Sequence, residues 1–129
     1  MTSGIATAAM AGMTHAVLSD AEVALFAQFA QPRPLPAGQW LFLRGHPGQS
    51  MYVILEGQIE LDFGEDLLVK TLGRHEFFGE LGLLMGNHAR SAGARAMSDC
   101  TVLELGPDAF QRLVDADPGL VAQFLRRTI

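Results

Sequence analysis

Residues 51–63, Met-Tyr-Val-Ile-Leu-Glu-Gly-Gln-Ile-Glu-Leu-Asp-Phe, indicate two β-strands joined by a tight turn. Residues 51–55 form a continuous apolar run, which is typical of a buried strand. Glu56-Gly57 marks the turn. The segment after it alternates polar with apolar residues, and a strand places alternate side chains on opposite faces. The side chains expected to point inward are Ile59, Leu61 and Phe63.

Further short strands are expected on both sides of this pair, at residues 40–43, 67–72 and 101–105. Clusters of turn-forming residues, such as Gly45-His46-Pro47-Gly48, lie between them. Short strands at regular spacing, separated by glycine-rich turns, predict an antiparallel sandwich or jelly roll.

Helices are expected at both ends of the strand region. Ser19-Asp20-Ala21-Glu22 has the sequence of a capping box and precedes apolar residues at helical spacing, which predicts a helix over residues 20–29. The three prolines within residues 32–36 are expected to end this helix. Pro107 and Asp117-Pro118 each mark the start of a closing helix. The expected fold class is therefore mainly β, with an N-terminal helix and two C-terminal helices.

Length, charge and cysteine content narrow the class of protein. The chain has 129 residues and a formal charge of -5, which fits one domain and disfavours direct nucleic-acid binding. Cys100 is the only cysteine, so an internal disulfide is excluded. No apolar stretch reaches the roughly 18 residues of a membrane span. A secretory signal requires a positively charged residue before its apolar run, but the first Lys or Arg of this sequence is Arg33. We expect a cytoplasmic protein with a flexible tail over residues 1–17 and one domain over residues 18–129.

The segment over residues 78–92, Phe-Gly-Glu-Leu-Gly-Leu-Leu-Met-Gly-Asn-His-Ala-Arg-Ser-Ala, carries the most chemistry. Gly79 permits a close backbone approach. Residues 81–85 can form a short helical turn, whose unpaired amides point toward the preceding loop and favour an anion.

Three side chains of this segment add to the anion site. The Glu80 carboxylate can accept a hydrogen bond from a hydroxyl, and the planar Arg90 guanidinium can clamp a phosphate bidentately. Ser91 adds a hydroxyl donor. The set suits a ligand with a phosphate beside a sugar hydroxyl. The alternative is that Glu80 and Arg90 form only a surface ion pair.

The segment resembles the phosphate-binding cassette of the cyclic nucleotide-binding domains of the catabolite activator protein and of the regulatory subunits of cAMP-dependent protein kinase. The matching residues are Phe-Gly-Glu-Leu-Gly-Leu at 78–83 and Arg-Ser-Ala at 90–92. The resemblance extends to residues 35–39, 44–48, 51–57 and 100–105, and covers residues 18–129 overall.

The resemblance implies an antiparallel β jelly roll (double-stranded β-helix) and a nucleotide site. Arg90 would pair with the cyclic phosphate, and Glu80 would accept a hydrogen bond from the ribose 2′-hydroxyl. The ligand-binding residues that it implies are Gly79, Glu80, Leu81, Gly82, Arg90 and Ser91. A hydroxyl at Ser91 is compatible with either cAMP or cGMP.

The expected function is that of a sensor or regulatory module that binds cAMP or cGMP and signals by movement of its C-terminal helices. We expect no catalytic residue, no metal and no cofactor other than this ligand. A homodimer and a separate effector protein both remain open as partners.

Two features depart from the family pattern. His75-Glu76 stands where the family usually has Gly-Asp, outside the phosphate site. The closing helix stops at Ile129, whereas the catabolite activator helix is long, dimerises and leads into a DNA-binding domain. We therefore expect no direct DNA binding by this chain.

Two other functions are weighed against the nucleotide sensor. One is an assembly or regulatory module of the same fold that binds no nucleotide. The other is a metal-dependent jelly-roll enzyme, which is disfavoured because the histidines are widely spaced and form no His-x-His pair. These histidines are His15, His46, His75 and His88.

Overall fold

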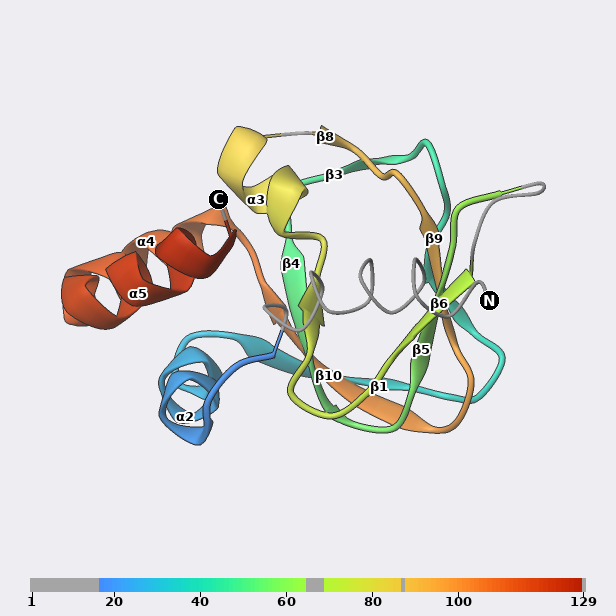
Figure 1. Cartoon of the computed structure of the whole chain (residues 1–129), viewed down its shortest axis with the longest axis horizontal. Coiled ribbons are helices and arrows are strands. Elements are labelled where there is room, and N and C mark those ends of the chain that lie inside the picture. The colour runs from blue at the N-terminus through green and yellow to red at the C-terminus, as the bar shows by residue number, and fades with distance from the viewer. Residues whose placement is uncertain (1–16, 65–68, 87, 129) are drawn as a thin grey trace, which may run out of the picture.

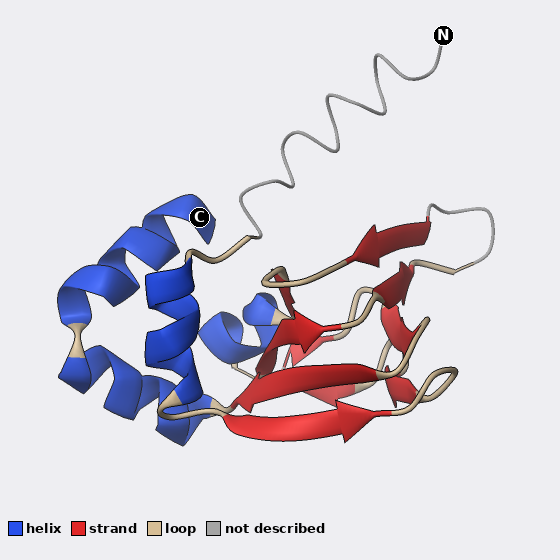
Figure 2. Cartoon of the chain, turned by 90° about the horizontal axis from the view of Figure 1, so that it is seen from below, coloured by secondary structure: helices blue, strands red, loops and turns tan. Residues whose placement is uncertain are grey.

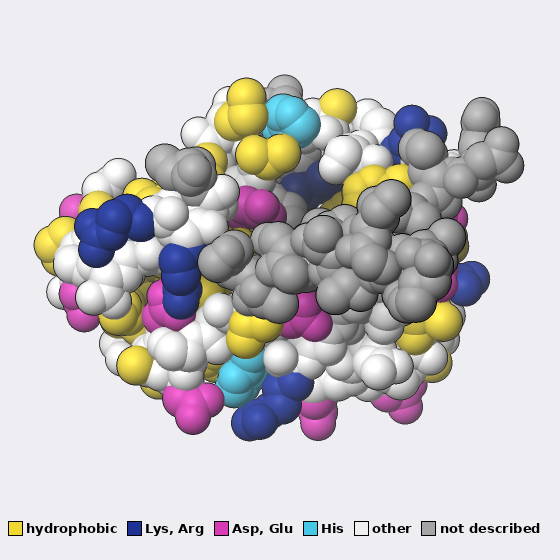
Figure 3. Space-filling model, viewed as in Figure 1, with side chains coloured by type: hydrophobic (Ala, Val, Ile, Leu, Met, Phe, Trp, Pro, Cys, Tyr) yellow, Lys and Arg dark blue, Asp and Glu magenta, His cyan; other side chains and the backbone are white. Residues whose placement is uncertain are grey.

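The computed structural model describes residues 17–64, 69–86 and 88–128. Its strands form two four-stranded antiparallel sheets and one two-stranded ladder, and its helices gather at one end of the molecule (Figures 1 and 2). The fold class expected from the sequence, a jelly roll with helices at both ends of the chain, is confirmed. None of the helices in the described part of the chain is long and apolar enough to cross a membrane. Basic and acidic side chains are scattered over the face of the molecule seen in Figure 3.

The first sheet has the strand order β1-β10-β4-β7 and the second has the order β2-β9-β5-β6. The strands of the first sheet are β1 (Gln31–Leu35), β4 (Met51–Glu56), β7 (Phe77–Phe78) and β10 (Cys100–Leu105). Those of the second are β2 (Trp40–Phe42), β5 (Ile59–Asp62), β6 (Val69–Leu72) and β9 (Gly93–Ala96). The two-stranded ladder pairs β3 (Pro47–Gly48) with β8 (His88–Ala89).

The helices begin and end close to the expected residues. They are α2 (Asp20–Ala27), α3 (Glu80–Met85), α4 (Pro107–Ala116) and α5 (Pro118–Thr128). The capping box of α2 is confirmed, because the Glu22 amide donates to Ser19 Oγ at 3.1 Å and the Ser19 amide donates to Glu22 Oε1 at 2.8 Å. The helix ends two residues earlier than the 20–29 expected from the sequence.

The proline-rich segment after α2 is a strand, which the sequence interpretation missed. Among the described strands, β1 pairs only with β10 and forms the edge of the first sheet. An edge strand tolerates proline because one side of its backbone needs no hydrogen-bond donor. The short strands β3, β7 and β8, together with β9, were also absent from the expectation.

The first sheet is buried on both faces, which accounts for the unbroken apolar run of β4. Met51 and Val53 face a core shared with the helices, whereas Tyr52 and Ile54 face the barrel interior. The same division separates the neighbouring residues Phe77 and Phe78 of β7. The cassette therefore begins at the last residue of a strand that contacts both cores.

An ion pair joins the N-terminal helix to the last helix. Glu22 of α2 is buried and accepts a hydrogen bond from Nη2 of Arg127, in the last turn of α5.

Residues 1–16 of the expected tail, and residues 65–68 of the expected turn and strand, lie outside the described residues. Val17 forms a bridge with Glu76.

The departure at His75 leaves a tight turn in place. His75 adopts φ 68°, in the left-handed region that favours glycine. Its amide donates to the Ile54 carbonyl at 2.6 Å, and the Ile54 amide donates to the Glu76 carbonyl at 2.9 Å. The turn is therefore fixed to β4 despite the missing glycine.

Candidate functional site

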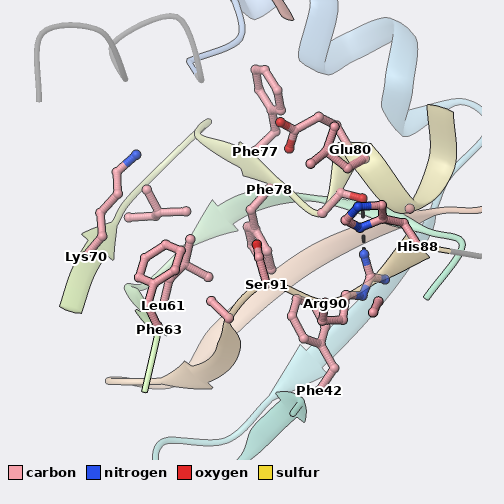
Figure 4. A pocket seen from close by; sticks show the side chains of 16 residues that line it. Phe42, Leu61, Phe63, Lys70, Phe77, Phe78, Glu80, His88, Arg90 and Ser91 are labelled. Atoms are coloured by element: carbon pink, nitrogen blue, oxygen red, sulfur yellow. Dashed lines mark hydrogen bonds between the residues drawn. The ribbon is translucent and has the colours of Figure 1, made fainter. Parts of the chain in front are cut away.

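A pocket with a cavity volume of about 210 Å³ opens between α3, the second sheet and the segment after β8 (Figure 4). Its walls are mostly apolar, with Phe42, Leu61 and Phe63 among them. The residues singled out from the sequence all line it: Gly79, Glu80, Leu81, Gly82, Arg90 and Ser91. The structure thus brings together residues from both parts of the 78–92 segment.

Arg90 is held by two backbone carbonyl groups and an aromatic ring. Its Nη1 donates to the Gly79 carbonyl at 3.1 Å, and its Nη2 donates to the Ser50 carbonyl at 2.8 Å. The guanidinium carbon lies 4.3 Å from the centroid of the Phe42 ring, within the range of a cation–π contact. These contacts fix the orientation of the guanidinium plane.

The charge of Arg90 has no counterion in the described part of the chain. The residue is only 7% exposed, and it takes part in none of the ion pairs found among residues 17–64, 69–86 and 88–128. Its Nε is buried without a hydrogen-bond partner. Burial lowers the pKa of the Arg90 guanidinium, yet arginine stays protonated in proteins. A buried cation without a counterion is costly, so the site is suited to an anion.

The surface ion pair considered as an alternative is not formed. Glu80 and Arg90 both line the pocket, but Arg90 is buried and uses its two terminal nitrogens on backbone carbonyls. Glu80, the first residue of α3, is half-buried and Ser91 is exposed. The side chains of Glu80 and Ser91 are therefore accessible to a ligand in the pocket.

Three glycines allow the elements around Arg90 to approach one another. A Cβ atom at Gly48 would lie 2.2 Å from Arg90 Cζ, and one at Gly79 would lie 2.9 Å from Arg90 Nη1. A Cβ atom at Gly82 would lie 2.5 Å from the Gly48 carbonyl oxygen. Gly79 also has φ +78°, which favours glycine.

The sequence predicts unpaired backbone amides in the first turn of α3, but the amide of Gly82 is paired. The Gly82 amide donates to the Gly79 carbonyl at 3.1 Å. Gly82 therefore serves the site by its lack of a side chain, and its amide is already used within the turn.

Some residues of the pocket were not singled out from the sequence. Phe42 and Lys70 line it from β2 and β6. Ser50, whose carbonyl accepts a hydrogen bond from Arg90, lies just before β4 and outside the pocket lining. The expected strand over residues 67–72 did indicate that Lys70 points inward, because alternation along a strand places Lys70 on the same face as Leu72. His88 also lines the pocket. Within the described ranges, no group of three or more His, Cys, Asp or Glu side chains could hold a metal ion.

Several known proteins are similar to this chain in sequence. The family model for the cyclic nucleotide-binding domain matches residues 32–117. The chain is 37% identical over 94 residues to the cAMP-dependent protein kinase regulatory subunit of Emericella nidulans, covering 72% of this chain and 22% of that protein. It is 32% identical over 109 residues to an uncharacterized NTE family protein of Mycobacterium tuberculosis, covering 84% of this chain and 18% of that protein. The chain thus spans about a fifth of the length of these curated relatives.

A solved structure has the same fold over most of its length. It comes from work on a cyclic-GMP-dependent signalling pathway that regulates bacterial phytopathogenesis. The two share 58% sequence identity and a TM-score of 0.86, covering 88% of this chain and 93% of the other.

Proposed function

The chain belongs to the cyclic nucleotide-binding domain family, and we propose that it is a regulatory module, not an enzyme, which binds cAMP or cGMP in the pocket beside α3. The observation that carries the proposal is Arg90, a buried cation without a counterion among the described residues. A cyclic phosphate supplies the missing negative charge and an acceptor for the terminal guanidinium N–H groups that the two carbonyls leave unpaired.

Two further side chains suit the rest of the nucleotide. Glu80 accepts a hydrogen bond from the ribose 2′-hydroxyl, and Ser91 donates to the phosphate; both line the pocket with Arg90. The structural relative at 58% identity comes from a cyclic-GMP-dependent pathway, so cGMP is the first ligand to test.

The path for a signal starts at Phe77 and at Phe78, the first residue of the cassette. Phe78 packs on Tyr52 in the barrel, with ring centroids 5.5 Å apart. Phe77 packs on Phe124 of α5, with ring centroids 5.0 Å apart. A shift of the cassette toward the nucleotide therefore changes the packing of Phe77 on α5. Binding moves the C-terminal helices to the extent that the nucleotide prefers one of their positions.

Hydrogen exchange followed by mass spectrometry tests this movement. We expect cGMP or cAMP to change the exchange rates of α4 and α5 by about threefold or more, because Phe77 of β7 packs on α5 and both closing helices belong to the same core. Linear 5′-GMP and 5′-AMP serve as ligand controls, and β1, which contributes no residue to the pocket, serves as an internal reference. Saturating cyclic nucleotide that leaves α4 and α5 unchanged would refute signalling through these helices.

Replacing Gly48 with alanine is expected to weaken nucleotide binding, although Gly48 itself is not a proposed ligand. The new Cβ atom would lie 2.1 Å from Arg90 Nε and 2.2 Å from Cζ, so the guanidinium must leave the carbonyls that orient it. The loss of such charge-assisted bonds is expected to reduce affinity by about 10–100-fold, as measured by calorimetric titration. Gly119→Ala is the matched control, because its nearest neighbouring atom lies 3.7 Å away. Equal affinities for the two variants would contradict the assigned role of Gly48.

A further inference from the structure

Glu104 is a charged residue on the barrel-facing side of β10. It lies opposite Tyr52 of β4 in the strand register, and alternation along the strand places it on the same face as the core residue Val102. The Tyr52 hydroxyl donates to Glu104 Oε2 at 3.2 Å. Arg33 of β1 donates through Nη1 to Glu104 Oε1 at 3.1 Å. Arg33, Glu104 and Tyr52 therefore form a polar row across three neighbouring strands of the first sheet.

The polar row ends at the phosphate site. Tyr52 is only 5% exposed, and the centroid of its ring lies 5.8 Å from the guanidinium carbon of Arg90. Its hydroxyl, at the other end of the side chain, is bonded to Glu104. Glu104 itself does not line the nucleotide pocket. Its carboxylate thus lies behind Arg90, separated from the pocket by the side chain of Tyr52.

The charge of Glu104 acts on Arg90 across this ring. Burial lowers the pKa of the Arg90 guanidinium, and the carboxylates of Glu104 and Glu80 oppose that shift, Glu104 the more strongly. Charges inside a protein interact over several ångströms because the interior screens them less than water does. Glu104 therefore offsets part of the cost of the buried cation before any ligand arrives. The same carboxylate repels an anion that binds to Arg90.

We propose that Glu104 weakens the hold of Arg90 on the cyclic phosphate and so sets the nucleotide concentration at which the domain responds. The inference rests on the proposed function and describes the regulation of the same site. In the empty pocket the carboxylate stabilises the Arg90 cation, and in the occupied pocket it repels the phosphate, so both effects favour the empty state. Arg33 acts in the opposite sense, because its positive charge offsets that of Glu104.

The test is calorimetric titration of the wild-type chain, Glu104→Gln and Arg33→Gln with cGMP and with cAMP. Glu104→Gln keeps the size of the side chain and removes its charge, so it is expected to bind nucleotide about threefold to tenfold more tightly. Arg33→Gln is expected to bind about threefold more weakly, since Glu104 loses its counterion. If the polar row only supported the packing of Tyr52, both variants would bind more weakly.

Glu60→Gln is the matched control for the loss of a paired carboxylate. Glu60 also pairs with an arginine, Arg95, at 3.7 Å, but it belongs to β5 of the second sheet and does not line the nucleotide pocket. Its affinity for nucleotide is expected to stay within about twofold of the wild type. A thermal melt establishes that each variant is folded.

Tyr52 provides a second measurement in the unmutated chain, because it is the only tyrosine in the sequence. Burial raises the pKa of Tyr52, Glu104 raises it further, and the charge of Arg90 lowers it. A phosphate on Arg90 offsets that last effect, so saturating cGMP is expected to raise the pKa of Tyr52. Glu104→Gln is expected to lower it. The near-ultraviolet absorbance of the tyrosinate measures both shifts.

The outcomes separate this inference from the proposed function. A wild type that binds neither nucleotide refutes both. A wild type that binds, while Glu104→Gln binds equally well or more weakly, refutes only the role of Glu104. If Glu104→Gln does not fold, the other two measurements decide. Arg33→Gln that binds as tightly as the wild type, or a pKa of Tyr52 that saturating cGMP leaves unchanged, would also overturn the inference.

Discussion

Arg90→Ala is expected to reduce cyclic nucleotide affinity by about 2–5 kcal/mol, which corresponds to about 30-fold to several thousandfold in Kd. The variant removes the one buried guanidinium of the pocket, along with its bonds to the carbonyls of Gly79 and Ser50. The phosphate would then lose the cation that we assign to it, in a pocket whose walls are mostly apolar. Isothermal titration with cGMP and cAMP measures the loss.

Arg95→Ala is the matched control for this variant. Arg95 also has a buried Nε without a partner, but it pairs with Glu60 at 3.7 Å, packs against Trp40 and does not line the pocket. Its removal is expected to leave nucleotide affinity within about threefold of the wild type. Arg90→Lys should restore only part of the affinity, because an ammonium cannot form the bidentate contact. Wild-type affinity in Arg90→Ala would refute the phosphate site.

Phe124→Ala is expected to lower the free energy of unfolding by about 3–5 kcal/mol, the usual cost of removing a buried aromatic ring. Phe124 is 0% exposed. Its ring packs edge-on against Phe77 and against Phe26, with centroids 5.0 Å and 5.5 Å away. The cavity would therefore open where α2, α5 and β7 meet. Urea unfolding at equilibrium measures the change.

Gln123→Ala, at the exposed neighbouring position of α5, is the control and is expected to change stability by about 0.5 kcal/mol or less. If Phe124→Ala remains folded, it should still bind nucleotide, because Phe124 does not line the pocket. The exchange rates of α5 should then respond less to the nucleotide than in the wild type. A loss of stability no larger than that of Gln123→Ala would show that the helices are not packed on β7 as described.

Much of the fold could be predicted because its signals are local. The apolar run of β4 and the capping box of α2 each lie within a few consecutive residues, and both were confirmed. The two-residue strands β3 and β8 carry no such signal, since they form only where the chain brings them together. β9 reads Gly-Ala-Arg-Ala, which has low strand propensity. Its Gly93 is needed there, because a Cβ atom would lie 2.7 Å from the Trp40 ring.

The residues of the candidate site that lie within the cassette could be predicted from the sequence, whereas those contributed by other segments could not. Glu80 and Arg90 were assigned to one pocket from the cassette, and the structure places them there. The Ser50 carbonyl and the Phe42 ring, which orient the guanidinium, come from the segment before β4 and from β2, and gave no sequence signal of that role. Lys70 could have been predicted to point inward from strand alternation, but not to line the same pocket.

Calorimetric titration of the wild-type chain with cGMP and then cAMP tests the central claim most directly. The account predicts saturable binding of one cyclic nucleotide per chain. At a ligand concentration of about 100 times Kd, binding should stabilise the fold by roughly 2.7 kcal/mol in a parallel thermal melt. Linear 5′-GMP should bind more weakly. If the folded chain binds neither cyclic nucleotide at about 1 mM, the claim is contradicted, and the domain would instead be an assembly module of the same fold.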